Sequence, residues 1–121
     1  MKNFLNIPES VIIFKNKFFF IIKDSFPVSP GHLLIISNEL RKDYFELSKD
    51  EKDNLSEVIN QAKLLIEKNN SPDGYNIGMN CGKYAGQTIY HFHCHVIPRY
   101  KGDIEHPEGG VRGVIPNMMK Y

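Results

Sequence analysis

Apolar residues gather in short runs in the first third of the chain, and their spacing predicts strands. Residues 11–23, VIIFKNKFFFIIK, hold two β-branched and aromatic runs separated by Asn16-Lys17, a pattern typical of a β-hairpin. Neither run alternates cleanly with polar residues, so we expect both strands to be buried on both faces. The segment DSFPVSPG at 24–31 predicts a loop, and HLLIIS at 32–37 predicts the next strand.

One amphipathic helix is predicted to begin after Ser48. Ser48 and Glu51 have the spacing of a capping box, in which each side chain bonds the other residue's backbone amide. The following apolar residues recur at steps of three and four and form one stripe: Leu55, Val58, Ile59, Ala62, Leu65 and Ile66. NNSPDG at 69–74 ends this helix, and a shorter helical piece is expected within 41–47.

The second half of the chain adds two more strands. YNIGMN at 75–80 predicts one strand, CGKYAG at 81–86 a glycine-bearing loop, and residues 87–99 a second strand. The tail after Arg99 is rich in Gly and Pro, so we expect it to wrap the surface or a partner subunit. The fold class is therefore α+β, a mainly antiparallel sheet of about five strands with one principal helix, in a single domain over residues 1–121.

Composition narrows the functional classes. The chain has 121 residues and a formal net charge of +1, which gives no electrostatic argument for binding nucleic acid or an acidic membrane surface. Its two cysteines, Cys81 and Cys94, form no framework spacing, as is typical of a reducing compartment. No secretory signal or membrane-spanning run is present in the sequence, so a soluble cytoplasmic protein is expected.

The segment GQTIYHFHCHVIPR at 86–99 carries the chemistry, because His91, His93 and His95 recur at every second residue. On a strand such residues share one face, while Phe92, Cys94 and Val96 share the other. Three neutral imidazoles are costly to bury without partners, and three charged ones repel one another. This pattern therefore indicates a functional site and not ordinary core.

Two chemistries fit three such histidines. They can ligate a metal ion with an open position, although such sites usually also have a carboxylate to orient a ligand, and the nearest acidic residues, Asp103 and Glu105, lie beyond Pro98. Alternatively, a neutral imidazole nitrogen can attack phosphorus and form a covalent intermediate. Neutral donors for the phosphate oxygens lie upstream of the triad: Asn80, Gln87 and Thr88. His32 lies at the start of another strand. We favour the covalent chemistry.

The triad and the residues around it resemble a known family. The run His91-Phe92-His93-Cys94-His95-Val96-Ile97 resembles the signature of the histidine-triad (HIT) nucleotide hydrolases and transferases. PVSPGHLLI at 27–35 resembles the upstream strand of that family, and residues 75–103 resemble its core block. GGVRGVIP at 109–116 resembles the ending of bacterial members. The resemblance covers residues 7–116 and implies the HIT fold and a homodimer.

The resemblance also implies catalytic roles for four histidines. His93, the middle triad residue, would attack the α-phosphorus and become transiently nucleotidylated. His91 would orient the His93 ring, chiefly through its backbone carbonyl. His95 and His32 would contact the phosphate and neutralise charge, and His95 is one candidate for protonating the leaving group.

Further positions match residues that bind the nucleotide in the family. Asn80, Gln87 and Thr88 match positions that bond phosphate oxygens or the bridging atom. Asp24 matches the position that holds the ribose hydroxyls, although it could instead be a turn residue that ends the hairpin strand. Ile22 would form part of the wall around the base.

Two departures from the family pattern refine what it implies. The N-terminus lacks the Cys-x-x-Cys by which many bacterial relatives bind structural zinc, so no zinc is expected there. The third triad residue is His95, where transferase and phosphorylase relatives often have Gln, and this difference favours a hydrolase.

The expected reaction is hydrolysis of a purine nucleotide derivative, either a nucleoside phosphoramidate or a dinucleoside polyphosphate, to a nucleoside monophosphate. No cofactor is expected beyond Mg²⁺ that accompanies a polyphosphate substrate. A nucleotide-binding scaffold with negligible turnover and a His-ligated metalloenzyme are the alternatives.

Overall fold

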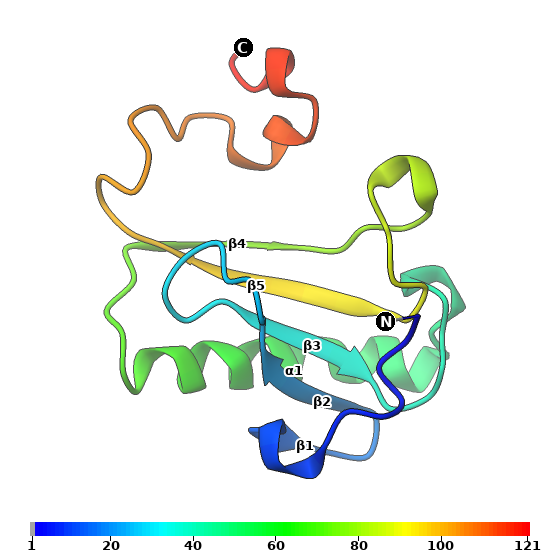
Figure 1. Ribbon diagram of the computed structural model, residues 1–121. Helices are drawn as coiled ribbons and strands as arrows, with labels where there is room; N and C mark the ends of the chain where they lie inside the picture. Colours follow the sequence, from blue (N-terminus) through cyan, green and yellow to red (C-terminus); the bar gives the residue numbers. More distant parts are fainter. Residues whose placement is uncertain (1) are drawn as a thin grey trace.

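Five antiparallel strands form a single sheet in the computed structural model, which describes residues 2–121 (Figure 1). The strands are β1 (Phe14–Lys15), β2 (Phe19–Lys23), β3 (Leu33–Ser37), β4 (Gly74–Gly78) and β5 (His93–Arg99). Their order across the sheet is β1-β2-β3-β5-β4, which makes β4 an edge strand and places β5 between β3 and β4. The predicted fold class is confirmed.

The first two strands form the predicted hairpin. Phe14 pairs with Ile21, and the Asn16 carboxamide oxygen accepts from the amides of Phe18 and Phe19 at 2.8 and 2.9 Å. This side chain closes the turn because its oxygen bonds the backbone two and three residues ahead. β2 is buried from Phe19 through Ile22, as the unbroken apolar run predicts.

The helix α1 (Lys49–Glu67) begins with the predicted capping box. The Ser48 hydroxyl accepts from the Glu51 amide at 3.1 Å, and the Glu51 carboxylate accepts from the Ser48 amide. Short 3-10 helices complete the secondary structure: η1 (Glu9–Val11), η2 (Tyr44–Glu46), η3 (Lys83–Ala85), η4 (Gly110–Val114) and η5 (Pro116–Met118). Within residues 2–121, no helix combines the length and apolarity needed to cross a membrane.

The two faces of the sheet have different coverings. One face packs against α1 and forms the main core, with Ile35, Phe92 and Cys94 all 1% exposed or less. The opposite face carries Phe20, Ile22, Leu34 and Ile36, which are covered by the N-terminal segment around Phe4 instead of a helix. In the antiparallel register Ile36 lies opposite His93 and Leu34 opposite His95. The second and third triad histidines therefore lie on the face away from α1.

The C-terminal segment leaves the sheet after β5. Residues 104–121 cross above β4 with η4 and η5 at their end (Figure 1). Their apolar side chains are exposed, including Val111, Val114 and Ile115 at 63%, 75% and 59%. Within one chain this segment does not join the core.

Candidate active site

The triad strand starts later than predicted. β5 begins at His93 and not at residue 87, so His91 lies in a bend before the strand. The chain leaves the ladder here because the Phe92 amide donates to the Arg41 carbonyl at 2.6 Å. The prediction that all three histidines lie on one strand is thus wrong for His91. The predicted common face holds, because Phe4 packs against the rings of both His91 and His93, at 5.5 and 5.2 Å between centroids.

His91 is completely buried, and both of its ring nitrogens are used. Its Nδ1 accepts from the Phe4 amide at 3.0 Å, and its Nε2 lies 2.8 Å from the Ser37 carbonyl, to which it must donate. Burial lowers the pKa of His91 from its usual range. A neutral ring whose two nitrogens are both hydrogen-bonded fixes the backbone that leads into β5.

His93 is held in one tautomer with its outer nitrogen free. Its Nδ1 lies 2.8 Å from the His91 carbonyl oxygen, which can only accept, so the proton resides on Nδ1. Nε2 therefore carries a lone pair, and it makes no hydrogen bond within residues 2–121. Phe4 packs edge-on against the ring, with centroids 5.2 Å apart. The carbonyl contact expected of His91 is present. The role of His93 as a nucleophile stays a prediction.

A chain of hydrogen bonds fixes the tautomers of His32 and His95. The Val28 amide donates to His32 Nδ1 at 3.1 Å, so the His32 proton lies on Nε2. His32 Nε2 lies 2.9 Å from His95 Nδ1, which must accept, and this places the His95 proton on its own Nε2. His95 thus presents an N–H donor beside His93, whose ring centroid is 5.4 Å away.

Both of these histidines are neutral at pH 7. Burial, followed by the nearby His93 and His32, lowers the pKa of His95 to about 4, against a smaller opposing effect of Asp24. Burial also lowers the pKa of His32, again opposed by Asp24. A histidine in this state donates a hydrogen bond and leaves a departing group to carry its own charge.

Asp24 lies against the histidine pair. Its Oδ2 is 3.4 Å from His32 Nε2 and 3.8 Å from His95 Nδ1, while its Oδ1 accepts from the Phe26 amide at 2.8 Å. The contact between Asp24 and His32 follows from the register of β2 and β3 and not from any local pattern in the sequence. Because Lys23 pairs with Leu33, the next residues outward, Asp24 and His32, lie side by side. The ribose contact expected of Asp24 stays a prediction.

Among the described residues, one group has the spacing of metal ligands: one ligand atom from each of Asp24, His32 and His95 lies within 4.8 Å of the others. The hydrogen bonds do not fit a bound ion. A ligating histidine normally keeps a proton on its other nitrogen, but the Val28 amide donates to His32 Nδ1, and Nε2 therefore carries the proton. A cation at Nε2 would have to displace the only proton of this ring.

Gln87 does not lie where its predicted contact with phosphate requires. Its side chain is 3% exposed: Oε1 accepts from the Gly82 amide at 2.8 Å, and Nε2 donates to the carbonyls of Lys42 and Ile89. Both N–H groups of the amide are therefore directed into the protein, and no donor is left for a phosphate oxygen. We therefore correct the prediction and assign Gln87 to the support of the loop that precedes the triad.

The other two predicted phosphate donors are accessible. Asn80 follows β4 and Thr88 follows the η3 loop, and both side chains are exposed. The Asn80 amide lies 3.8 Å from the point where a Cβ on Gly86 would stand. Gly86 has a φ of +96°, which glycine adopts without strain and which closes the η3 turn. Contacts of Asn80 and Thr88 with phosphate stay predictions, as does the contact of buried Ile22 with the base.

The depressed histidine pKa values predict a pH-dependent stability. The folded pKa of His95 is about 4, below the usual 6.5, so between these values the unfolded chain binds a proton that the folded protein does not. Stability should therefore fall as the pH drops from 7 towards 4, by about 1.4 kcal/mol for each unit of pKa difference, and His95 contributes no further loss below pH 4. The free energy of unfolding, measured with urea across this pH range, should fall less steeply with decreasing pH in His95→Gln than in the wild type. An equal dependence on pH in the two proteins would contradict the assignment.

The sequence is similar to those of known proteins. The sequence matches the HIT domain over residues 5–102. It is 33% identical to a bis(5'-adenosyl)-triphosphatase of Dictyostelium discoideum over 82% of this chain and 66% of that protein. It is 29% identical to an AP-4-A phosphorylase of Mycobacterium tuberculosis over 96% of this chain, yet it spans only 60% of that protein's length.

A solved structure shares the architecture described above. The hypothetical histidine triad nucleotide-binding protein ST2152 of Sulfolobus tokodaii superimposes with a TM-score of 0.71 at 34% identity. The match covers 76% of this chain and 62% of the other.

Proposed function

Because the chain belongs to the histidine triad (HIT) family, we propose that it hydrolyses purine nucleotide derivatives at the α-phosphate through a nucleotidyl-histidine intermediate. The product would be a nucleoside monophosphate. The observation that carries the proposal is the fixed tautomer of His93, whose Nδ1–H is held by the His91 carbonyl at 2.8 Å while Nε2 keeps its lone pair. Relatives named as dinucleoside polyphosphate enzymes support a nucleotide substrate.

In the first step, His93 Nε2 attacks the α-phosphorus. The Nε2–P bond forms as the bond from phosphorus to the leaving group breaks, and the leaving group departs with the electron pair. His95 would donate a hydrogen bond from its Nε2–H to the departing atom or a phosphate oxygen, since the His32 contact at 2.9 Å sets that tautomer. Asn80 and Thr88 would bond further oxygens.

In the second step, water attacks the phosphorus of the intermediate. The Nε2–P bond breaks, its electron pair returns to His93, and the nucleoside monophosphate is released with one proton lost to solvent. Ile22, Leu34 and Phe20, each 6 or 7% exposed, form an apolar cluster beside the histidines, and the base would lie at the edge of this cluster.

The state of His95 favours one of the two substrate classes. With its pKa lowered to about 4, the ring is neutral at pH 7 and supplies a hydrogen bond in place of a transferable proton. A nucleoside polyphosphate leaves as a stable anion, whereas the amine of a phosphoramidate must gain a proton to leave. We therefore propose a dinucleoside polyphosphate as the preferred substrate, with Mg²⁺ carried by the substrate itself.

We also propose that the active form is a cytoplasmic homodimer. The edge strand β4 has backbone groups free to pair, and the exposed apolar residues of the C-terminal segment include Val111, Val114 and Ile115. Sedimentation equilibrium should give a mass twice that of the 14.0 kDa chain. A monomer at all concentrations would refute this part of the proposal.

The experiment that tests the function compares diadenosine tetraphosphate with adenosine 5'-phosphoramidate in Mg²⁺ buffer containing 1,10-phenanthroline, which removes transition metals and leaves Mg²⁺. We expect AMP from both, with the higher kcat/KM for the tetraphosphate. Nucleotide that binds without yielding AMP would identify a binding protein instead. Activity that phenanthroline abolishes and zinc restores would identify a metalloenzyme, and ADP formed only when inorganic phosphate is added would identify a phosphorylase.

A further inference from the structure

His93 and His95 on β5 divide the face of the sheet that points away from α1 into two halves. On the side of β3 and β2, residues across from the triad are large and apolar: Ile36 lies opposite His93, and Leu34 opposite His95. On the side of β4, the residue opposite His95 is Gly78, and Asn76 follows opposite Ile97. Since directly paired residues point to the same face, the two sides of the histidines differ in size and polarity.

Gly78 leaves open space beside His95. A Cβ built on Gly78 would meet no atom within 4 Å, so no neighbouring side chain fills the space that the glycine leaves. Glycine is not required there for its backbone, because Gly78 is absent from the glycines with positive φ. A glycine inside a strand weakens the strand and often marks a place where another group approaches closely.

A cleft lies further along β4, towards the start of the strand. This cleft has a volume of about 790 Å³ and lies between the end of β4, with Gly74 and Asn76, and the segment from Arg99 to Gly110. Gly74 lies opposite Arg99 in the same ladder, on the same face as His95 and Gly78. A cleft of this size falls within the range of small-molecule sites, about 300–1,000 Å³.

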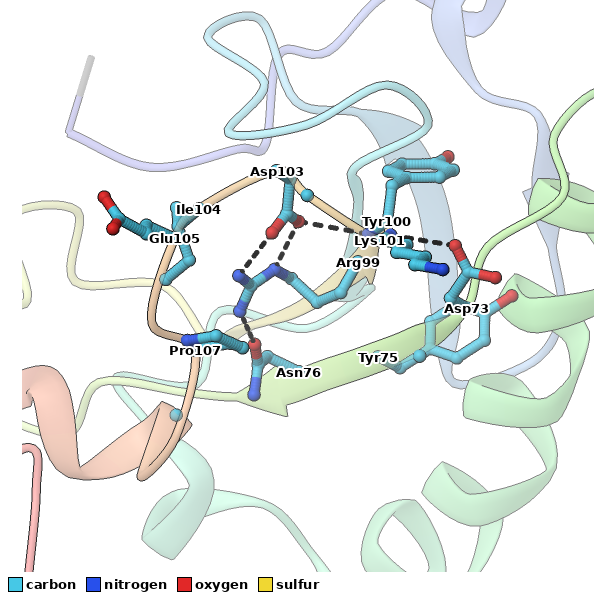
Figure 2. A pocket seen from close by; sticks show the side chains of 13 residues that line it. Asp73, Tyr75, Asn76, Arg99, Tyr100, Lys101, Asp103, Ile104, Glu105 and Pro107 are labelled. Atoms are coloured by element: carbon cyan, nitrogen blue, oxygen red, sulfur yellow. Dashed lines mark hydrogen bonds and ion pairs between the residues drawn. The ribbon is translucent and has the colours of Figure 1, made fainter.

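The charges around the cleft suit the nucleoside end of a ligand better than its phosphates. Figure 2 shows Arg99 held by Asp103 through two contacts, at 2.7 and 2.9 Å, and by Asn76 at 2.7 Å. Its guanidinium is therefore already neutralised, and the lining holds three carboxylates, those of Asp73, Asp103 and Glu105, against the two cations of Arg99 and Lys101. The Asn76 amide nitrogen is left as a neutral donor.

We propose that the leaving group of the substrate runs from His95 over Gly78 into this cleft, and that Gly78 is the position that admits a second nucleoside. The inference rests on the proposed hydrolysis at His93. The α-phosphate would lie at His93 and His95, the remaining phosphates over Gly78 near Asn80, and the second nucleoside between β4 and residues 104–110. The large apolar half of the face remains for the first nucleoside.

The test uses two substrates that share the reacting centre and differ in the leaving group, diadenosine tetraphosphate and adenosine 5'-phosphoramidate. Gly78→Val places a branched side chain in the open space beside His95 and should lower kcat/KM for the tetraphosphate by at least about tenfold relative to the phosphoramidate. Gly78→Ala should give a smaller change in the same direction. If Gly78→Val fails to fold, the alanine variant decides the question alone.

The matched control is Ile77→Val, because it places the same side chain next to Gly78 on the opposite face of β4. Its ratio of the two kcat/KM values should equal that of the wild type. An equal loss on both substrates at Gly78, or no loss on either, would overturn the inference while AMP production by the wild type still supports the hydrolase. If the wild type produces no AMP from either substrate, both the hydrolase and the inference that rests on it are wrong.

Discussion

Replacing His93 with alanine is expected to lower kcat/KM for every nucleotidyl substrate by at least about 10⁴-fold, the scale on which enzymes lose a covalent nucleophile. The reason is geometric. His93 Nε2 is the ring nitrogen whose lone pair is left free, since His91 uses both of its nitrogens and His95 Nε2 carries a proton. Acid-quenched wild type should carry an adenylyl group by intact-protein mass spectrometry, and the variant should carry none.

The variant must remain folded and able to bind nucleotide for this loss to count. His93 packs against Phe4 but is only partly buried, so the alanine variant should keep its circular dichroism spectrum and bind AMP in equilibrium dialysis. Lys49→Ala serves as the control, because this side chain is exposed on α1, on the other side of the sheet from His93, and the variant should retain full turnover. An adduct that peptide mapping places on His95 would show that the nucleophile had been misassigned.

Local signals explain why most of the fold could be predicted from the sequence. The capping box at Ser48 and Glu51 acts within one turn, and the turn at Asn16 is closed by its own side chain, so both signals are local in the sequence. The same holds for the apolar stripe of α1, which needs only one surface to pack against. The HIT resemblance rests on the triad, which is likewise contiguous in sequence.

The start of β5 could not be predicted because a distant segment determines it. Residues 87–92 have the alternation of a strand, but the Phe92 amide bonds to Arg41 and the His91 ring to Ser37 and Phe4. Those partners precede the triad by 50 residues or more, and period-two spacing carries no information about them. The contact between Asp24 and His32 likewise required the register of β2 and β3.

The role of Gln87 was the main disagreement between resemblance and structure. A neutral amide just before the triad suits a phosphate oxygen as well as it suits a backbone carbonyl, so sequence alone could not separate the two. Burial decides between them, because a side chain that is 3% exposed and bonded to three backbone groups has no donor left for a ligand. Through its hydrogen bonds Gln87 thus connects the loop after β4, the segment after β3 and the residues that lead into the triad.

This assignment predicts that Gln87→Glu lowers the free energy of unfolding by about 3 kcal/mol. The carboxylate oxygen that replaces Nε2 would face the carbonyl oxygens of Lys42 and Ile89, at the places now 2.6 and 3.1 Å from a donor. Two hydrogen bonds would be replaced by repulsion between acceptors in a buried position. Urea denaturation at pH 7, followed by circular dichroism, measures the loss directly.

The neighbouring Thr88 supplies the matched comparison, because its side chain is exposed and directly follows Gln87. Thr88→Ala should leave the free energy of unfolding within about 0.5 kcal/mol of wild type, while kcat/KM falls if its hydroxyl bonds the phosphate as proposed. The two variants thus separate support of the loop from contact with substrate. Wild-type stability in Gln87→Glu, combined with a large loss of turnover, would reverse the assignment and make Gln87 a phosphate ligand. If Gln87→Glu loses stability and Thr88→Ala does not, Gln87 holds the loop in place, and the exposed donors of the loop depend on that support.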